Sequence, residues 1–159
     1  MIRAIFLDVD GTLISFSTHE IPASALRALA QAHERGVRLF IATGRAANDL
    51  GPLEGILYDG VVSLNGARCV ANDGRVVSLH PIPRADFERA LALSEEQGFA
   101  MGLELEEGVF VNRVTPDVER VAHMVAHPVP EQTDLRELFG RVECCQLCFY
   151  FDAETQRRV

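Results

Sequence analysis

The sequence lacks any long hydrophobic run, so it offers no candidate for a membrane-spanning helix. No apolar stretch approaches the roughly 18 residues that a helix needs to cross a bilayer. A secretory signal is also missing from the N-terminus, because Arg3 is followed by a short strand-like run that ends in two aspartates. We therefore expect no membrane partner and a cytoplasmic location.

Lysine is absent from the 159 residues, so all 15 basic side chains are arginine. They are outnumbered by 23 acidic side chains, which gives a formal net charge of −8. This surplus disfavours a phosphate-backbone partner, so we expect no binding of nucleic acid. A small molecule that arrives with a metal ion suits this charge better.

Cysteine is scarce, and its spacing argues against a zinc site. The four cysteines are Cys69, Cys144, Cys145 and Cys148. Residues 144–151 are typical of a buried strand, in which side chains three apart point to opposite faces, so Cys145 and Cys148 would not bind one ion. His123 and His127 lie one helical turn apart, but the sequence offers them no nearby third ligand. We expect the cysteines to be small buried hydrophobic residues.

Strand-like and helix-like segments alternate in the first part of the chain. Short apolar runs typical of buried parallel strands lie at 2–7, 37–42 and 60–64. Helices are expected at 22–35 and 46–53. Pro22 suits the first turn of the longer helix, and Gly36 suits its end. This order predicts right-handed crossovers and an α/β fold with a parallel sheet.

The pattern changes after Gly66, where hairpin signals appear. Pairs of short strands flank Asn72-Asp73-Gly74 and Glu106-Glu107-Gly108. Thr115 and Pro116 suit the N-cap and the first position of a helix. The expected elements are hairpins at 67–79 and 99–113, helices at 83–97, 115–126 and 134–139, and a strand at 144–151. They compose an α+β segment.

The length of 159 residues is sufficient for one ordinary domain or for two small domains. We place the boundary after the first hairpin, near residues 80–83, which gives one domain at 1–82 and the second at 83–159. The sequence shows no flexible linker, internal repeat or low-complexity segment between them.

Two carboxylates at the end of the first strand carry the strongest chemical signal. Asp8 and Asp10 would lie at the carboxyl edge of a parallel sheet, where α/β proteins bind ligands, and Gly11 would let the chain turn there. One carboxylate can attack phosphorus to give an aspartyl-phosphate, while the other protonates the leaving oxygen and later activates water. Mg²⁺ would neutralise the phosphate charge. Without a cation nearby, repulsion between the two acids would raise one of their pKa values.

The end of the second strand offers a matching set of phosphate-binding groups. Thr43-Gly44-Arg45 supplies a hydroxyl, backbone N–H groups and an expected helix N-terminus. Each residue has a simpler alternative. Asp8 and Asp10 suit an ordinary turn, Thr43 a helix cap, and Arg45 a surface ion pair. Asn65, which can offer an amide to the pocket, also suits an ordinary Asn-Gly turn.

With Asp8-Val9-Asp10-Gly11-Thr12-Leu13 and Ala42-Thr43-Gly44-Arg45, the chain resembles the haloacid dehalogenase (HAD) superfamily. Ile21-Pro22, Asn65-Gly66-Ala67 and the segment from about 83 onward are similar to its Cof-like phosphatases with a type IIB cap. The resemblance implies the N-terminal portion of a Rossmann-like core followed by an α+β cap.

By this resemblance Asp8 is the nucleophile and a Mg²⁺ ligand, and Asp10 is the general acid/base whose backbone carbonyl also binds the metal. Thr43 and Gly44 bind the phosphate, with Arg45 and Asn65 as further substrate-binding candidates. Family ATPases carry threonine in place of the second aspartate, and dehalogenases lack this acid. Asp10 therefore indicates a phosphatase or phosphomutase, with a small phosphorylated metabolite, such as a sugar phosphate, as the substrate.

The chain departs from the family pattern in two places. The family's third motif is a lysine, occasionally an arginine, and its fourth is an acidic loop that completes the Mg²⁺ site. In Cof-like enzymes both follow the cap, whereas this chain has no lysine and ends at Val159. We expect a fragment of a longer phosphatase; the alternatives are a second chain that supplies the missing strands and a non-catalytic phosphate-binding relative. The edge of a three-stranded parallel sheet would also favour self-association.

Overall fold

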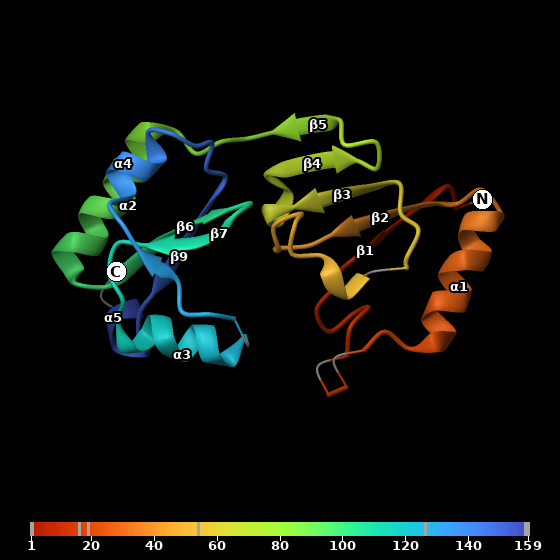
Figure 1. Ribbon diagram of the computed structural model, residues 1–159, viewed down its shortest axis with the longest axis horizontal. Helices are drawn as coiled ribbons and strands as arrows, with labels where there is room; N and C mark the ends of the chain where they lie inside the picture. Colours follow the sequence, from red (N-terminus) through yellow and green to blue (C-terminus); the bar gives the residue numbers. More distant parts are fainter. Residues whose placement is uncertain (1, 16, 19, 54, 126, 158–159) are drawn as a thin grey trace. The chain divides into compact units, whose positions relative to one another are not determined.

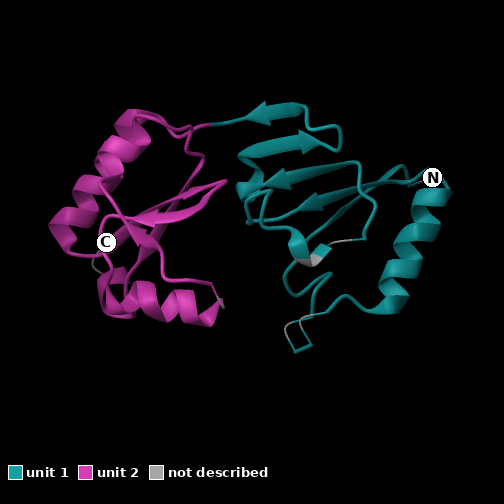
Figure 2. Ribbon diagram, viewed as in Figure 1, with its two compact units in different colours: residues 1–80 teal, residues 81–159 magenta. Residues whose placement is uncertain are grey.

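The computed structural model describes residues 2–15, 17–18, 20–53, 55–125 and 127–157. The chain divides into two compact units, residues 1–80 and residues 81–159 (Figure 2). No helix in the described part of the chain is long and apolar enough to cross a membrane.

The first unit contains a five-stranded sheet in the order β1-β2-β3-β4-β5 (Figure 1). Its strands are β1 (Ala4–Leu7), β2 (Arg38–Ala42), β3 (Gly60–Ser63), β4 (Arg68–Ala71) and β5 (Val76–Leu79). The first three strands are parallel, which confirms the predicted arrangement. The hairpin β4–β5 continues the same sheet in antiparallel pairing, so the sheet is mixed rather than a three-stranded parallel sheet.

Helix α1 (Ala23–Glu34) connects β1 to β2 and has the predicted start and stop signals. It begins directly after Pro22, and the chain turns away at Gly36, whose φ of +79° favours glycine. Leu29 of this helix packs against the buried core of the unit. The helix therefore contacts the core through Leu29, although none of its residues is fully buried.

The prediction of a helix at 46–53 is wrong. Only the single 3₁₀ turn η1 (Gly51–Leu53) forms there. Gly51 disfavours helix, and Pro52 has no N–H to donate to an earlier turn, so a regular helix would lose both propensity and a hydrogen bond. The apolar residues of this segment are nevertheless buried, because Leu50 and Leu53 are only 8% and 2% exposed.

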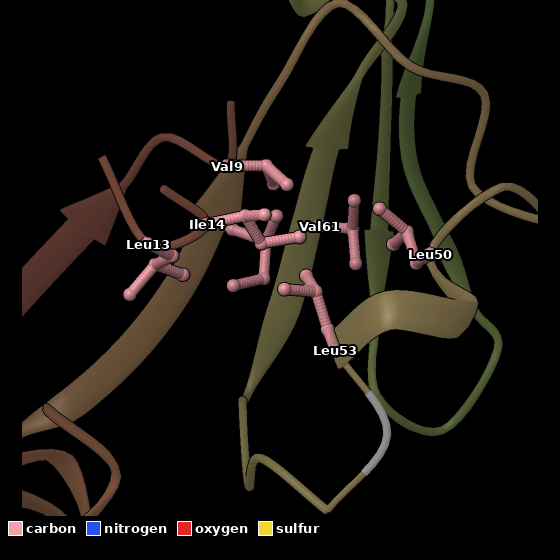
Figure 3. Packing of buried hydrophobic residues seen from close by; sticks show 7 residues of the cluster. Val9, Leu13, Ile14, Leu50, Leu53 and Val61 are labelled. Carbon is pink, nitrogen blue, oxygen red and sulfur yellow. The ribbon is translucent and has the colours of Figure 1, made fainter. Parts of the chain in front are cut away.

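A buried cluster fixes the loop that follows β1. Figure 3 shows its side chains pointing toward one another from the β1 loop, from β3 and from the segment around η1. The labelled members are Val9, Leu13, Ile14, Leu50, Leu53 and Val61. Because Val9 is 1% exposed, the backbone on either side of it has little freedom to move. Its two neighbours in sequence, Asp8 and Asp10, are therefore carried on a packed loop.

The second unit contains a four-stranded sheet in the order β8-β7-β6-β9. The strands are β6 (Ala100–Leu105), β7 (Gly108–Val111), β8 (Glu131–Gln132) and β9 (Gln146–Tyr150), and the helices are α2 (Arg84–Gln97), α3 (Pro116–Met124), α4 (Leu135–Phe139) and α5 (Ala153–Gln156). Met101 and Leu103 of β6 pack with α2 and α4, whereas Ala100 packs with Val118 of α3. Helices therefore cover both faces of this sheet.

Two local expectations in the second unit have clear outcomes. The Thr115 hydroxyl accepts a hydrogen bond from the Val118 N–H, which confirms the predicted N-cap of α3. The expected strand at 144–151 is shorter than predicted, because Cys144 and Cys145 precede β9. The opposite-face argument for Cys145 and Cys148 therefore does not apply, since only Cys148 lies in a strand.

Two leucines on α2 provide a test of the core of the second unit. Leu91 is 2% exposed and Leu93 is 41% exposed. We expect Leu91→Ala to lower the free energy of unfolding by about 2–5 kcal/mol, because it leaves a cavity in the core. Leu93→Ala on the same helix should cost less than about 1 kcal/mol. Urea unfolding measures both, and equal losses would contradict the assigned core.

Candidate active site

The chain makes a tight turn directly after β1, at the point where Asp8 leaves the sheet. The Val9 carbonyl accepts a hydrogen bond from the Ile14 N–H at 2.9 Å, and the Gly11 N–H donates to the Ile14 carbonyl at 2.8 Å. Gly11 has a φ of +80°, so the turn requires glycine. The exposed carboxylate of Asp8 accepts a hydrogen bond from the Thr12 hydroxyl at 2.9 Å.

Asp10 forms a two-point ion pair with Arg45, which follows the neighbouring strand β2. Both the Nε and Nη2 groups of Arg45 donate to the Asp10 carboxylate at 2.8 Å. The remaining Nη1 group donates to the Asp49 carboxylate at 3.2 Å. Arg45 therefore links the turn after β1 to the loop after β2, in a planar geometry that lysine does not reproduce.

The same pair sets the ionisation of Asp10. Hydrogen bonds from Arg45, reinforced by its charge, hold the pKa of Asp10 below its usual value and outweigh the effect of burial. The bond to Asp10 likewise raises the pKa of Arg45. The rise of one carboxyl pKa that is expected for two acids without a cation does not occur at Asp10, because Arg45 of the chain itself is bonded to its carboxylate.

Thr43 lies at the end of β2 and is only 6% exposed. Its N–H donates to the Val62 carbonyl at 2.9 Å, which ties it to β3. Its hydroxyl oxygen accepts the Arg45 N–H at 3.1 Å, and this bond leaves the hydroxyl proton available as a donor. The predicted helix N-terminus after Thr43 is absent, since η1 begins only at Gly51. The Thr43 hydroxyl therefore stabilises the first turn of a loop and not the start of a helix.

A left-handed turn, η2 (Leu64–Gly66), follows β3 at the same edge of the sheet. The φ angles of Leu64, Asn65 and Gly66 are +50°, +54° and +94°. The left-handed conformation costs about 1–2 kcal/mol for a residue with a side chain, although asparagine tolerates it better than leucine. Leu64 is 5% exposed, so its packing holds the conformation in place.

Two backbone hydrogen bonds connect η2 to the loop after β2. The Leu64 N–H donates to the Arg45 carbonyl at 3.1 Å, and the Asn65 N–H donates to the Thr43 carbonyl at 3.2 Å. The side chain of Asn65 lies against Gly44. A Cβ atom at Gly44 would lie 3.2 Å from the Asn65 Oδ1 atom, which is tighter than an ordinary contact.

The structure therefore brings five of the six candidate residues into one connected group. These are Asp10, Thr43, Gly44, Arg45 and Asn65. Asp8, the sixth, joins the group through the turn that also carries Asp10. Sequence reasoning missed Asp49 and Leu64. The i, i+4 spacing of Arg45 and Asp49 was a usable signal.

The donor set for Mg²⁺ is partial. Mg²⁺ prefers hard oxygen ligands and usually retains water and substrate phosphate beside one or two carboxylates. Asp8 presents an exposed carboxylate that fits this chemistry, whereas the Asp10 carboxylate is engaged by Arg45. Within the described residues there is no group of three or more His, Cys, Asp or Glu side chains that could hold a metal ion. That finding includes the described cysteines and histidines considered for zinc.

Comparison with known proteins places this arrangement in a family. A family model described as haloacid dehalogenase-like hydrolase matches residues 5–158. The chain belongs to this family. The HAD membership and the α/β fold class predicted from the sequence are thereby confirmed.

Individual relatives agree with the family assignment. BT1666 from Bacteroides thetaiotaomicron, described among phosphatases of the HAD superfamily, is 53% identical with a TM-score of 0.94, over 100% of this chain and 59% of that chain. The HAD subclass IIB sugar phosphatase BT4131 is 29% identical with a TM-score of 0.83, over 98% of this chain and 61% of that chain. The putative phosphatase YkrA of Bacillus subtilis (strain 168) is 30% identical over 95 residues, which is 59% of this chain and 36% of YkrA. This HAD-like chain thus spans about three-fifths of the two structures and about a third of YkrA.

The Asp10–Arg45 pair predicts a pH-dependent stability. Because the pKa of Asp10 is lower in the folded protein, the pair stabilises the fold above the ordinary aspartate pKa and stops doing so as the pH falls through the lowered value. At neutral pH we expect a coupling energy of about 0.5–1 kcal/mol for this partly exposed pair. A double-mutant cycle with Asp10→Asn and Arg45→Ala, measured by urea unfolding from about pH 7 down to about pH 3, gives the coupling. A coupling that grows on acidification would contradict the assignment.

Cys148 in the second unit is expected to be unreactive. Burial, together with the nearby Glu104 carboxylate 3.5 Å from its sulfur, raises the pKa of the Cys148 thiol to about 12. At pH 8 its alkylation by iodoacetamide should be about 10³-fold slower than that of an ordinary thiol. Mass spectrometry of the native chain, with the urea-unfolded chain as a control, measures this rate. Rapid labelling of native Cys148 would show that the thiol is not held in this environment.

Proposed function

We propose that this site hydrolyses phosphate monoesters of small metabolites with the help of Mg²⁺. The observation that carries the proposal is the exposed Asp8 carboxylate at the end of β1, beside a second acid and the phosphate-binding groups of the next strand end. The likeness to the sugar phosphatase BT4131, over 98% of this chain, supports a sugar phosphate as the substrate.

Asp8 acts as the nucleophile in the proposed reaction. Its carboxylate oxygen forms a bond to phosphorus as the bond from phosphorus to the leaving oxygen breaks. Asp10, which takes up a proton from water once Arg45 exchanges its carboxylate for the phosphate, gives that proton to the leaving oxygen. Asp10 then takes a proton from water, whose oxygen attacks the aspartyl-phosphate. Phosphate leaves, and the Asp8 carboxylate is restored. The Thr12 hydroxyl orients Asp8 through the hydrogen bond at 2.9 Å.

Thr43, Gly44, Arg45 and Asn65 are the groups that we propose bind the phosphate. The Thr43 hydroxyl accepts from the Arg45 N–H and can donate its proton to a phosphate oxygen. Arg45 binds the Asp10 carboxylate in the structure and can bind a phosphate through the same two N–H groups. If Arg45 moves from Asp10 to the phosphate, the Asp10 carboxyl group becomes available for proton transfer.

The Asp8 carboxylate and the Asp10 backbone carbonyl are the groups that we propose hold Mg²⁺. When bound, the ion would neutralise the phosphate charge that otherwise repels an anionic nucleophile. The residues described here supply only these oxygens, so water and substrate would complete the coordination. The family uses a lysine to screen the phosphate charge, and this chain has no lysine. We therefore propose that phosphate hydrolysis requires a form of the protein in which another segment or chain supplies that positive charge.

Binding of a phosphorylated ligand without turnover is the second candidate function. It is favoured by the absence of lysine and by the engagement of the Asp10 carboxylate with Arg45. A cytoplasmic location and the absence of nucleic-acid and membrane partners stay predictions. Self-association also stays a prediction; it is favoured by the 61% exposure of Phe6 on the edge strand β1.

Asp8→Asn is the decisive substitution. We expect it to reduce Mg²⁺-dependent phosphate release from an aryl phosphate by at least about 10³-fold, because the amide is a poor nucleophile. The assay uses the 159-residue chain and the longest natural form of the protein. Asp73→Asn, a matched change in the β4–β5 hairpin, should retain full activity.

The outcomes separate the two candidate functions. Activity that survives Asp8→Asn would overturn the nucleophile assignment. Calorimetric binding of inorganic phosphate that requires Mg²⁺, without turnover in either form, would favour the binding function instead.

A further inference from the structure

The left-handed turn η2 is the most unusual backbone in the first unit. Leu64 and Asn65 are the two described residues other than glycine with positive φ, and they are consecutive. Residues in such conformations persist only where surrounding structure holds them, and they gather at functional sites. The turn follows the buried strand β3 at the edge of the sheet where the candidate site lies.

The handedness of the turn explains how it contacts the phosphate-binding loop, residues 43–45. In an extended strand successive N–H groups point to opposite sides, whereas in a helical turn they point the same way. The left-handed conformation therefore lets both the Leu64 and the Asn65 N–H groups reach the loop, where they donate to the carbonyls of Arg45 and Thr43.

These two bonds also fix the direction of the peptide groups in the loop. In a trans peptide the C=O and the following N–H point in opposite directions. Because the Thr43 and Arg45 carbonyls face η2, the N–H groups of Gly44 and Ala46 face away from it. Backbone N–H groups that share one direction can bind an anion, and the two bonds from η2 fix the direction of these N–H groups.

The Asn65 side chain adds a third contact with the loop. Its amide group lies against the Cα of Gly44, so closely that a Cβ there would approach Oδ1 to 3.2 Å and Nδ2 to 3.4 Å. The Asn65 side chain therefore occupies the space that a side chain at residue 44 would need. A change in one alters the space available to the other.

We propose that Asn65 is a positioning residue: held over Gly44 by the left-handed turn, its side chain keeps residues 43–45 in the conformation that receives phosphate. The inference rests on the proposed phosphate site and assigns to Asn65 an action through this loop. It also gives a reason for the strained turn, because a relaxed backbone would direct the amides and the side chain elsewhere.

Asn65→Gly tests the role of the side chain while preserving the turn. Glycine adopts positive φ freely, which offsets its greater freedom in the unfolded chain, so the Tm should stay within about 3 °C of wild type. The affinity for inorganic phosphate in the presence of Mg²⁺, measured by calorimetry, should fall by about 10-fold. In an active longer form, kcat should fall more than KM changes.

Asn72→Gly is the matched control in the same unit. Asn72 lies in the β4–β5 hairpin, away from the site, and is not among the residues with positive φ. This variant should lose a few degrees of Tm and keep the phosphate affinity of wild type.

Gly44→Ala completes a double-mutant cycle. It should weaken phosphate binding in the wild-type background, because the new methyl group meets Asn65. In the Asn65→Gly background the same substitution should cost little, since the opposing side chain is gone. Additive losses in the cycle would overturn the proposed coupling.

The failure of this inference is distinguishable from failure of the proposed function. Wild-type phosphate affinity in Asn65→Gly would overturn the positioning role and leave the phosphate site intact. A wild-type chain and longer form that neither bind nor hydrolyse phosphate would overturn the site itself, and with it the role of Asn65.

Discussion

Parallel pairing of the first three strands is the constraint on which the site depends. The register places Leu7 of β1 beside Ile41 of β2, so the chain leaves neighbouring strands at almost the same level, at Asp8 and at Thr43. Polar groups that are far apart in sequence therefore gather at one edge of the sheet. The buried cluster around Val9 keeps the first of these loops from moving away, so packing converts strand order into a defined arrangement of side chains.

Ion pairing contributes orientation more than stability. Arg45 is bonded at once to Asp10 and to Asp49, and its side chain is 24% exposed. Pairs of this exposure stabilise a fold only weakly, so the backbone and the core determine where the loops lie. The guanidinium then determines how the Asp10 carboxylate points and lowers its pKa. The left-handed turn after β3 likewise orients backbone groups, through its hydrogen bonds to the Thr43 and Arg45 carbonyls. Burial of Leu64 offsets the conformational energy that this turn costs.

The sequence predicts those features whose signals are local. The parallel strands follow from short apolar runs, and the α3 start follows from the capping preference of Thr115. The helix expected at 46–53 fails because buried apolar residues suit an irregular segment as well as a helix. The Asp10–Arg45 pair joins residues 35 positions apart, so no local pattern indicates it. The conformation of Leu64 is equally hidden, since leucine has no preference for positive φ and only tertiary packing imposes it.

Because every basic side chain is arginine, lysine acetylation cannot change the charge of the site. Acetylation acts on the ε-amino group of lysine and removes its charge, and no side chain in these 159 residues offers that group. The cation beside Asp10 is a guanidinium, which stays protonated throughout the physiological pH range. Acetyl donors and amine-directed reagents therefore cannot remove the positive charge of this loop. The charge does not depend on how much acetyl donor the cell contains.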